Sequence, residues 1–465
     1  MRDRVTGPFF DKSLKLVDGT MRKIYLLTPA NTVTGGPELL HQLCHKLNLF
    51  GFNAHIVYVV TDEHQSKETP LPYRKYNISV CDSIDDNENN IVIFPEIYLF
   101  ALNKIKKAQR IMWWLSVDNA LGDKEDFEYL FSQKDIMHFS QSQYSTEYIL
   151  SKGVERERIY WLSDYISSEF LHLKSIPAEL KKNVVVYNPR KGFEKTEELI
   201  KQAGDRVKWI PLEGYSPEGV RNILQESKVY IDFGNHPGKD RIPREAAYCG
   251  CCLLTNQKGS AGNDVDIPID TKYKIKHDTP AEDIIETILS FFDNYSSERV
   301  KLKSYIDRIE NEYRSFETDV LSIFEKIDHS VVNIDEKNEL RNQILTSVTN
   351  GDYSKALTCI VKYRQKEYEE DIDFSILEST ARSELGELNE AEHIARKALI
   401  SEESNYELML LLAKIHLYMK DYESVTACLS ECAKAVELAK DTADAETVIS
   451  IAKEYINQVK EILKL

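Results

Sequence analysis

The pattern that most constrains this chain is a strand, a glycine-bearing loop, a helix and a second strand, in that order. An apolar run at Lys23–Thr28 precedes Gly35 and Gly36, a segment of helical periodicity follows at Glu38–Leu49, and another apolar run occupies Ala54–Val60. A unit of this kind builds a parallel sheet whose faces are covered by helices. Three more short apolar runs extend the series, at 91–94, 111–115 and 136–139. We therefore expect an open α/β lobe in the first part of the chain.

The same alternation recurs in the middle of the chain. Strand-like runs lie at 182–187, 207–210, 229–233 and 251–255, and a helical segment follows the first of them. At roughly 150 residues per domain, a chain of 465 residues has room for two such lobes and a third unit. We place the N-terminal lobe at 23–175 and the C-terminal lobe, with its closing helices, at 176–330. Open parallel sheets bind ligands at the carboxyl ends of their strands, so a ligand cleft between the lobes is expected.

After about residue 280 the strand pattern stops and helix-forming residues dominate, with no proline beyond Pro280. Three similar hexapeptides begin at Gly351, Gly386 and Lys420, so their starts are 35 and 34 residues apart. Tetratricopeptide repeats have a period of about 34 residues, and their stacked helix pairs bury a shared core. We predict an all-α, tetratricopeptide-like module at 335–465, in which the helices after Asp441 cover the last apolar face. An unrelated helical bundle is the alternative.

Composition excludes several classes of protein. The formal net charge of −17 argues against a nucleic-acid partner. The apolar runs are far shorter than the roughly 20 residues that span a bilayer, so we expect no transmembrane segment. Residues 1–22 lack the apolar stretch of a secretory signal and form an N-terminal extension whose role stays open. Eight cysteines, three of them crowded at Cys249, Cys251 and Cys252, are typical of reduced thiols in a cytoplasmic protein.

Gly35 and Gly36 lie between a predicted strand and a predicted helix. The missing side chains would let a ligand approach the backbone and the helix N-terminus. Paired glycines are equally common in tight turns, so this loop by itself does not indicate a ligand.

Polar residues concentrate between Asp232 and Gly250, directly after a predicted buried strand. The segment holds three cations within six positions, namely Lys239, Arg241 and Arg244. Arginine suits bidentate recognition of phosphate. Glu245 can accept hydrogen bonds from sugar hydroxyls, and His236 could donate to a phosphate or transfer a proton. The alternative is a salt-bridged surface loop in which Asp240 and Glu245 neutralise the cations.

This segment and two others resemble GT-B glycosyltransferases of the family 4 and family 1 type. The C-terminal lobe of such enzymes reads strand, loop, Glu-Ala and a small-residue turn, which matches Val229–Gly234, Arg244–Gly250 and the strand Cys251–Thr255. Phe139–Glu147 is similar to the family's link out of the N-terminal lobe, and Asn188–Gly192 to the first loop of its C-terminal lobe. The resemblance covers roughly residues 23–330 and implies two Rossmann-like lobes.

The resemblance also implies roles for individual residues. In such enzymes a Lys or Arg of the first loop of the C-terminal lobe binds donor phosphate, which by position implies Arg190 and Lys191. Lys239, Arg241 and Arg244 join them as donor-binding candidates because of their charge and placement. The nucleotide ribose would be held by Glu245, and Gly35 and Gly36 correspond to the family's glycine-rich first loop. GT-B enzymes generally stabilise the leaving diphosphate with cationic side chains and helix dipoles, so no metal and no other cofactor is implied.

Two positions depart from the family pattern. Another glutamate is often found eight positions before the helix glutamate, and Pro237 stands there in this chain. The histidine expected in the N-terminal lobe is missing, and Trp113–Asn119 occupies that region. The choice between retention and inversion at the sugar therefore stays open. Trp113 and Trp114 could stack on a sugar, or they could belong to the core.

The candidate catalytic residues are His236 and two carboxylates at strand ends, Asp118 and Glu96. A carboxylate there could orient or deprotonate an acceptor hydroxyl, although either could instead cap the following helix. His41 and His45 are four residues apart on a predicted helix, a spacing that could bind a metal. No third ligand is evident, so we expect no metal site.

The sequence therefore predicts a glycosyltransferase that moves a sugar from a nucleotide-sugar donor to a hydroxyl of a saccharide or protein acceptor. The helical module would bind a protein partner or a second copy of the chain. The donor, the acceptor and the oligomeric state stay open. One competing hypothesis is a catalytically silent scaffold that binds partners through its repeats, and another is an epimerase or phosphorylase on the same fold.

Overall fold

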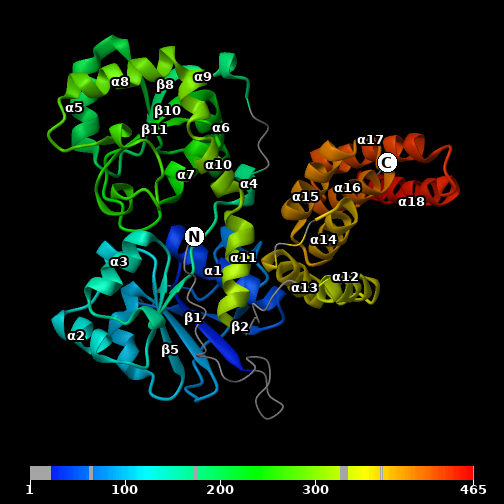
Figure 1. Cartoon of the computed structure of the whole chain (residues 1–465), viewed down its shortest axis with the longest axis horizontal. Helices are drawn as coiled ribbons and strands as arrows, with labels where there is room; N and C mark the ends of the chain where they lie inside the picture. Colours follow the sequence, from blue (N-terminus) through cyan, green and yellow to red (C-terminus); the bar gives the residue numbers. More distant parts are fainter. Residues whose placement is uncertain are drawn as a thin grey trace. The chain divides into compact units, whose positions relative to one another are not determined.

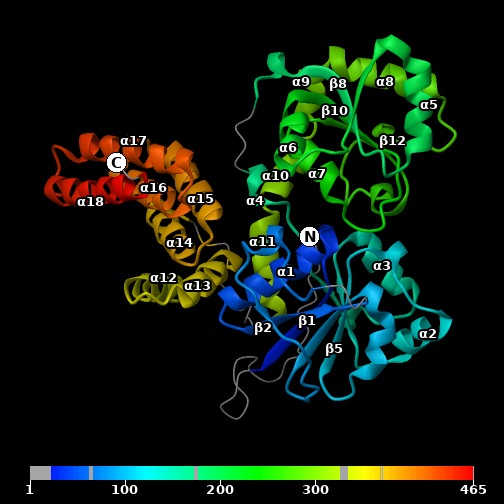
Figure 2. The same ribbon diagram turned by 180° about the vertical axis from the view of Figure 1, so that it is seen from behind.

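The structure is a computed structural model that describes residues 22–61, 66–171, 176–324, 334–366, 368 and 370–463 (Figures 1 and 2). The expected extension at 1–22 lies outside these residues, apart from residue 22. The chain divides into two compact units, one that contains both sheets and one made of the C-terminal helices.

Within the described residues the first sheet contains seven parallel strands in the order β3-β2-β1-β4-β5-β6-β7. The direction of strand order reverses between β1 and β4, as in a Rossmann-like sheet. The predicted N-terminal α/β lobe is thereby confirmed. The structure adds β3 and β7, which are too short to show a strand pattern in sequence. The strands are β1 (Lys23–Pro29), β2 (Asn53–Val59), β3 (Ser79–Val80), β4 (Ile91–Pro95), β5 (Gln109–Trp114), β6 (Met137–Ser140) and β7 (Ile159–Trp161).

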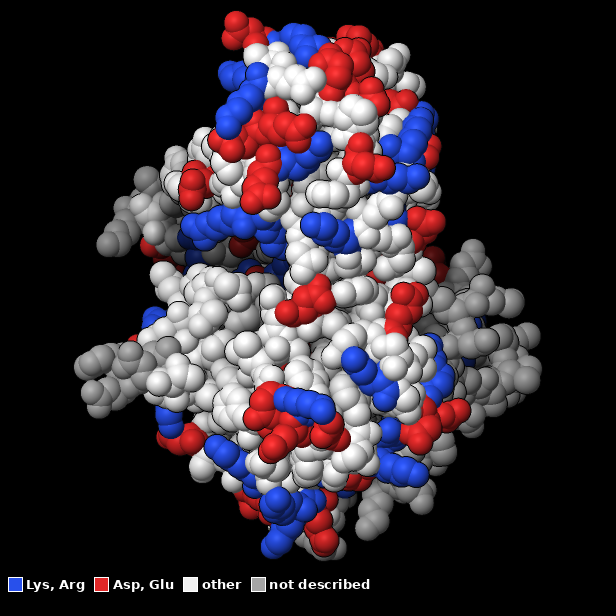
Figure 3. All heavy atoms as spheres, turned by 90° about the vertical axis from the view of Figure 1, so that its left-hand side faces the viewer, with Lys and Arg blue, Asp and Glu red and all other residues white. Residues whose placement is uncertain are grey.

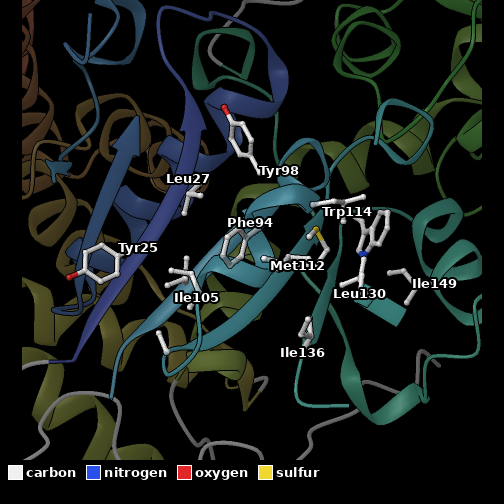
Figure 4. Packing of buried hydrophobic residues seen from close by; sticks show 14 of the residues in the cluster. Tyr25, Leu27, Phe94, Tyr98, Ile105, Met112, Trp114, Leu130, Ile136 and Ile149 are labelled. Carbon is white, nitrogen blue, oxygen red and sulfur yellow. The ribbon is translucent and has the colours of Figure 1, made fainter. Parts of the chain in front are cut away.

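Helices cover this sheet and bury it on both faces. Every residue of β4 is buried, which explains why these strands read as continuous apolar runs. Figure 4 shows one side of the core, where Phe94 and Met112 come from neighbouring strands and Trp114 lies near Leu130 and Ile149. The helices of this lobe are α1 (Gly35–Leu49), α2 (Lys124–Ser132) and α3 (Gln143–Ser151). The short α4 (Ser168–Leu171) falls in the range predicted for this lobe, but its Phe170 and Leu171 pack in the core of the C-terminal lobe.

A second sheet lies in the described part of the chain after residue 176. Its five parallel strands have the order β12-β11-β10-β8-β9. Its switch point lies between β8 and β10. The predicted second Rossmann-like lobe is confirmed. The strands are β8 (Lys182–Tyr187), β9 (Lys208–Pro211), β10 (Ser227–Asp232), β11 (Cys252–Asn256) and β12 (Lys274–Ile275). Apolar clusters pack on both of its faces.

In the described part of the chain, seven helices lie between the start of this sheet and residue 324. They are α5 (Phe193–Ala203), α6 (Pro217–Glu226), α7 (Arg241–Tyr248), α8 (Ala281–Asp293), α9 (Tyr295–Val300), α10 (Lys303–Glu310) and α11 (Glu312–Phe324). Helix α11 falls in the range predicted for the C-terminal lobe, yet it packs on the N-terminal lobe. Lys46 of α1 forms a fully buried ion pair with Glu317 at 3.0 Å, and the Phe324 ring contacts Phe52 and Phe139.

The second unit is all helical, as predicted. Its helices are α12 (Ile334–Thr349), α13 (Tyr353–Gln365), α14 (Ile372–Glu384), α15 (Leu388–Ser401), α16 (Tyr406–Met419), α17 (Tyr422–Ala439) and α18 (Ala445–Leu463). The residues that start the three hexapeptides, Gly351, Gly386 and Lys420, all have left-handed φ angles, of 74°, 83° and 61°. The repeat seen in the sequence is therefore a repeat of backbone geometry. Its tetratricopeptide character stays a prediction.

Helix α18 packs against α16 and α17 and buries Val448, Ala452 and Val459. This is the covering role expected of the last helices. Among the described helices, none combines the length and the apolar character needed to cross a lipid bilayer. All eight cysteines are free thiols, and those at Cys249, Cys251 and Cys252 are buried.

Candidate functional site

The carboxyl ends of both sheets meet across one cleft. In the N-terminal lobe the loops after β1, β5 and β6 reach the second lobe, and in the C-terminal lobe the loop after β10 receives them. Because both sheets present their switch points here, this is where an open α/β protein binds ligands. Figure 3 shows a hollow between the two halves of this face, with Lys and Arg side chains along its upper edge.

The loop after β10 packs tightly against the N-terminal lobe. A Cβ atom on Gly238 would lie 2.0 Å from the carbonyl oxygen of Leu115, so only glycine permits this approach. The Val117 amide donates to the Pro237 carbonyl at 2.7 Å. The lobes are thus joined through backbone atoms at the inner end of the cleft.

Six charged side chains form a network at the junction of the lobes, and we call it the interlobe network. Its cations are Lys239, Arg241 and Arg244, and its carboxylates are Glu38, Asp164 and Glu312. Arg244 lies 2.6 Å from both Asp164 and Glu312, and Lys239 lies 2.6 Å from Glu312. Arg241 lies 2.6 Å from Glu38 and 3.7 Å from Asp164.

The interlobe network is buried and balanced. Asp164, Arg244 and Glu312 are 2%, 1% and 6% exposed, and three cations face three carboxylates. Burial would raise the pKa of Asp164, but the cations around it hold that pKa below its ordinary value. Burial acts against the cations too, yet the carboxylates keep the pKa of Arg244 above its ordinary value. Three of the cations predicted to bind donor phosphate, Lys239, Arg241 and Arg244, are therefore already paired. Their partners are not the carboxylates that we named in the alternative of a surface loop.

The sequence analysis missed Asp164, Glu38 and Glu312. Asp164 lies shortly after β7, Glu38 is in the first turn of α1, and Glu312 opens α11. Each would pass for a solvated acidic residue or a helix-terminus charge in the sequence. No local pattern pairs them, because their partners lie between 68 and 203 positions away in the chain.

Gly35 and Gly36 begin α1 at the rim of the cleft. A Cβ atom on Gly35 would lie 3.9 Å from the Arg241 side chain, and one on Gly36 would lie 3.7 Å from Leu115. The N-terminus of α1 thus faces the cationic side of the other lobe, an arrangement suited to an anion. Their predicted role in donor binding remains a prediction.

Arg190 and Lys191 lie on the loop after β8, at the switch point of the second sheet. Arg190 is exposed and forms no ion pair with any residue that the structure describes. Lys191 Nζ lies 2.8 Å from Asp240 Oδ2. Gly192, the next residue, has a φ of 59° and lies against the Phe233 carbonyl, which brings this loop beside the one after β10.

Glu245 lies on α7, one position after Arg244. It is partly exposed, and within the described ranges its carboxylate has neither a hydrogen bond nor an ion pair. Burial raises the pKa of Glu245 to about 7, although the charges of Arg241 and Arg244 lower it. A carboxylate left unpaired in a cleft is suited to accept hydrogen bonds from ligand hydroxyls.

The three predicted catalytic residues occupy different environments. Asp118 is exposed and accepts hydrogen bonds from Tyr144 of its own lobe and Asn235 of the other, each at 2.9 Å. Glu96 is 3% exposed and accepts the Leu115 amide at 2.9 Å, and burial raises its pKa to about 7. His236 is fully buried, with Asp240 3.0 Å away.

Neither tryptophan of the Trp113–Asn119 segment reaches the cleft. Trp113 and Trp114 are both fully buried, and their indole nitrogens donate to the Leu162 carbonyl and to His138. The suggestion that one of them stacks on a sugar is wrong, because β5 is covered on both faces.

The two histidines of α1 use their ring nitrogens for contacts with other groups of the protein. His41 contacts the Pro37 carbonyl and the Tyr58 hydroxyl through its two nitrogens, and His45 accepts the Asn77 amide. In the described part of the chain, one group of side chains has the spacing of metal ligands, and it consists of Asp232, His236 and Asp240.

No family model matches this sequence, and no curated protein is similar to it in sequence. Among solved structures, sucrose-phosphate synthase (tll1590) from Thermosynechococcus elongatus is 12% identical with a TM-score of 0.49, over 66% of this chain and 98% of its own. Alr3699/HepE from Anabaena in complex with UDP-glucose is 10% identical with a TM-score of 0.48, over 66% and 100%. TarM is 11% identical with a TM-score of 0.47, over 66% and 100%. Likenesses at this level carry no argument about activity, so the architecture of this chain rests on the strand orders given above.

Proposed function

We propose that this chain transfers a glycosyl group from a nucleotide-sugar donor to an acceptor hydroxyl. The observation that carries the proposal is the cleft where the switch points of two parallel sheets meet. Two charged groups lie on the C-terminal lobe's side of it with no partner among the described residues, the guanidinium of Arg190 and the carboxylate of Glu245. A nucleotide sugar needs a cation for its diphosphate and a group that accepts hydrogen bonds from its hydroxyls.

In the proposed reaction the acceptor oxygen forms a bond to the anomeric carbon of the donor, and the bond from that carbon to the diphosphate oxygen breaks. The nucleoside diphosphate leaves with the electron pair of that bond. Arg190 and Lys191 neutralise the leaving group, helped by the backbone amides at the N-terminus of α1. Glu245 accepts hydrogen bonds from the ribose.

We assign the hydroxyl proton of the acceptor to Asp118. It is the exposed member of the three predicted catalytic residues, and it lies at the edge of the cleft between Tyr144 and Asn235. We expect Asp118→Asn to lower the transfer rate by about 10² to 10⁴ while donor affinity changes little. A variant that transfers at the wild-type rate would remove Asp118 from this role.

The cations of the interlobe network have a structural role in this proposal. Lys239 and Arg244 hold the two lobes together through Asp164 and Glu312. Arg241 is shared, because it contacts Glu38 and also lies beside Gly35. Transfer needs no metal, since side-chain cations and a helix N-terminus serve the leaving group, so we expect the rate to persist in the presence of a chelator.

The decisive experiment is calorimetry with UDP, GDP, ADP and CMP and their sugars. We expect one nucleotide class to bind, and both Arg190→Met and Glu245→Gln to weaken it by tenfold or more, on the order expected for a lost charge-assisted contact. Arg206→Met is the matched control, because Arg206 is an exposed arginine that pairs with Glu282 on the surface. Absence of any binding at millimolar concentration would refute the proposal.

A catalytically silent scaffold is the second candidate. It is favoured by the pairing of Lys239, Arg241 and Arg244 with carboxylates, which leaves fewer cations for a diphosphate. The same panel separates the two functions, since a scaffold would bind no nucleotide in any member of the series.

We further propose that the helical module binds a protein acceptor, an enzyme partner or a second copy of the chain. Stacked helix pairs offer extended surfaces for such contacts. The free thiols agree with action in the cytoplasm. Removing residues 335–465 should abolish transfer to the natural acceptor while donor hydrolysis continues; unchanged kinetics and unchanged oligomeric mass would oppose this role.

A further inference from the structure

The loop after β10 contains a buried histidine, His236, that contacts two carboxylates. His236 is fully buried, its Nδ1 lies 3.0 Å from Asp240 Oδ2, and its Nε2 lies 3.6 Å from Asp232 Oδ1. The two contacts use opposite nitrogens of one ring. A protonated imidazole carries a positive charge that both carboxylates attract at these distances, whereas a neutral ring carries none. The Nε2 atom of His236 also lies 3.5 Å from the backbone carbonyl oxygen of Asp232.

The contact with Asp240 connects His236 to a cation of the cleft. Asp240 Oδ2, the oxygen that faces His236, also lies 2.8 Å from Lys191 Nζ. At the other end, Asp232 accepts hydrogen bonds from the Tyr230 hydroxyl and the Gly234 amide, each at 3.0 Å. Asp232 is therefore fixed to its strand, and the chain of contacts runs from the core of the lobe to Lys191.

The backbone of His236 is held as firmly as its ring. The Ser260 amide donates to the His236 carbonyl at 2.9 Å, and a Cβ atom on Gly259 would lie 2.0 Å from that oxygen. Both residues belong to the turn η7 (Gly259–Gly262). The backbone at His236 is therefore fixed, and the side chain is fully buried.

A metal ion is a poorer occupant than a proton. One ligand atom from each of Asp232, His236 and Asp240 lies within 4.8 Å of the other two, but the contacts at 3.0 and 3.6 Å use different nitrogens of the ring. The ammonium of Lys191 also occupies Asp240, and an entering cation would have to displace it.

We propose that His236 is a positioning residue whose proton sets how available Lys191 is to the donor diphosphate. This inference rests on the proposed function, in which Lys191 contacts that diphosphate. With the proton in place, Asp232, His236, Asp240 and Lys191 sum to zero charge, and Asp240 divides its attraction between two cations. Without it the group carries one negative charge, and Asp240 holds Lys191 alone. Both effects weaken the binding of an anion.

The surroundings favour the protonated form of His236. Burial would lower the pKa of His236, but the hydrogen bond with Asp240 and the charge of Asp232 raise it above 6.5, and Lys191 opposes them. These are the charged groups that face the ring, from β10, from the loop before α7 and from the loop after β8. The turn η7 contributes backbone atoms, and the adjacent N-terminal lobe contributes the Val117 amide to Pro237.

The test is calorimetry with nucleotide sugars between pH 6 and 9, in pairs of buffers that differ in ionisation enthalpy. The diphosphate of a nucleotide sugar is fully ionised in this range, so the charge on its phosphates does not change. We expect affinity to fall about tenfold as the pH rises past the pKa of His236, the effect of one unit charge acting over several ångströms. Proton uptake on binding should appear in the same range.

Three variants of the full chain decide the source of this dependence. Glu245 titrates in the same range, so His236→Gln is needed to show how much of the pH dependence comes from other groups. In this variant, donor affinity should depend less on pH, and fewer protons should be taken up on binding. Asp240→Asn should move the fall in affinity to lower pH, and it serves if His236→Gln does not fold. His277→Gln, at an exposed histidine after β12, should behave as wild type.

Each remaining outcome is decisive. A profile and a proton uptake that His236→Gln and Asp240→Asn leave unchanged would overturn the positioning role while the proposed function stands. Zn²⁺ that binds the wild type, fails to bind His236→Gln and is required for donor binding would replace the proton by a metal. A wild type that binds no nucleotide sugar at any pH would overturn the proposed function itself.

Discussion

Replacing Arg244 by methionine should destabilise the two-lobed unit strongly. The substitution keeps much of the apolar volume but removes the guanidinium that lies 2.6 Å from both Asp164 and Glu312. The interlobe network then has two cations for three carboxylates, of which Asp164 and Glu312 are buried. Breaking one partner out of a buried ion pair costs about 3 to 5 kcal/mol, because a charge is left in a poorly solvating site. For a unit of this size the melting temperature should fall by about 4 to 8 °C.

The tryptophans make this measurement selective. All four lie at positions 113, 114, 161 and 209, within the lobes, so their fluorescence during urea unfolding reports on the two-lobed unit and not on the helical module. Arg206→Met is the control, since the Arg206 and Glu282 side chains are 40% and 45% exposed and water screens their interaction. Its unfolding curve should overlay that of the wild type.

A double variant tests the charge argument itself. Arg244→Met with Glu312→Gln restores the balance, with two cations facing two carboxylates, and it should recover at least half of the lost free energy of unfolding. The reasoning would be refuted by an Arg244→Met protein that loses less than about 1 kcal/mol, the range of an exposed pair. It would also be refuted by a double variant less stable than the single one by the full cost of a second broken pair.

Three further predictions concern single positions. Burial raises the pKa of Glu96 to about 7 from 4.5, so its ionisation costs stability as pH rises from about 4.5 to 7; Glu96→Gln should remove that slope and gain about 3 kcal/mol at pH 8 by urea titration. Burial would lower the pKa of His416, but hydrogen bonds with Glu392 and Glu431 raise it to about 9. Its contribution to the helical module is complete below about pH 6.5 and is lost as the pH rises through 9, which hydrogen exchange of α16 and α17 should detect, whereas unchanged protection at pH 10 would contradict it. Lys420→Gly should stabilise the module by about 1 kcal/mol, because a left-handed φ of 61° strains a residue with a side chain; the same exchange measurement would show no gain if the strain is absent.

The fold could be predicted to a large extent from local patterns. The apolar run at Lys23–Thr28 is β1, and the run at Cys251–Thr255 is β11 shifted by one residue. Parallel strands buried on both faces must be apolar throughout, which makes them visible without any alignment. The helical repeat was visible for a related reason, since Gly351 and Gly386 mark turns that need a left-handed backbone.

The candidate site was only partly predictable. Residues that follow buried strands, such as Arg190 and Glu245, could be assigned to the cleft because strand ends in parallel sheets share one edge. The same reasoning placed Lys239 and Arg244 there as free cations. It could not reveal that they are paired, since a charged residue looks the same in sequence whether water or a carboxylate surrounds it.

The sequence alone thus determined the two α/β lobes, the helical tail and the loops that border the cleft, because hydrophobic periodicity and turn chemistry act over short stretches of chain. Tertiary structure decided which charges neutralise one another, that α11 returns to the first lobe, and that His236 lies between two carboxylates with Lys191 beyond them. Those outcomes depend on contacts between residues up to 271 positions apart, and electrostatic interactions of that kind are set by burial and distance, which the three-dimensional packing alone defines.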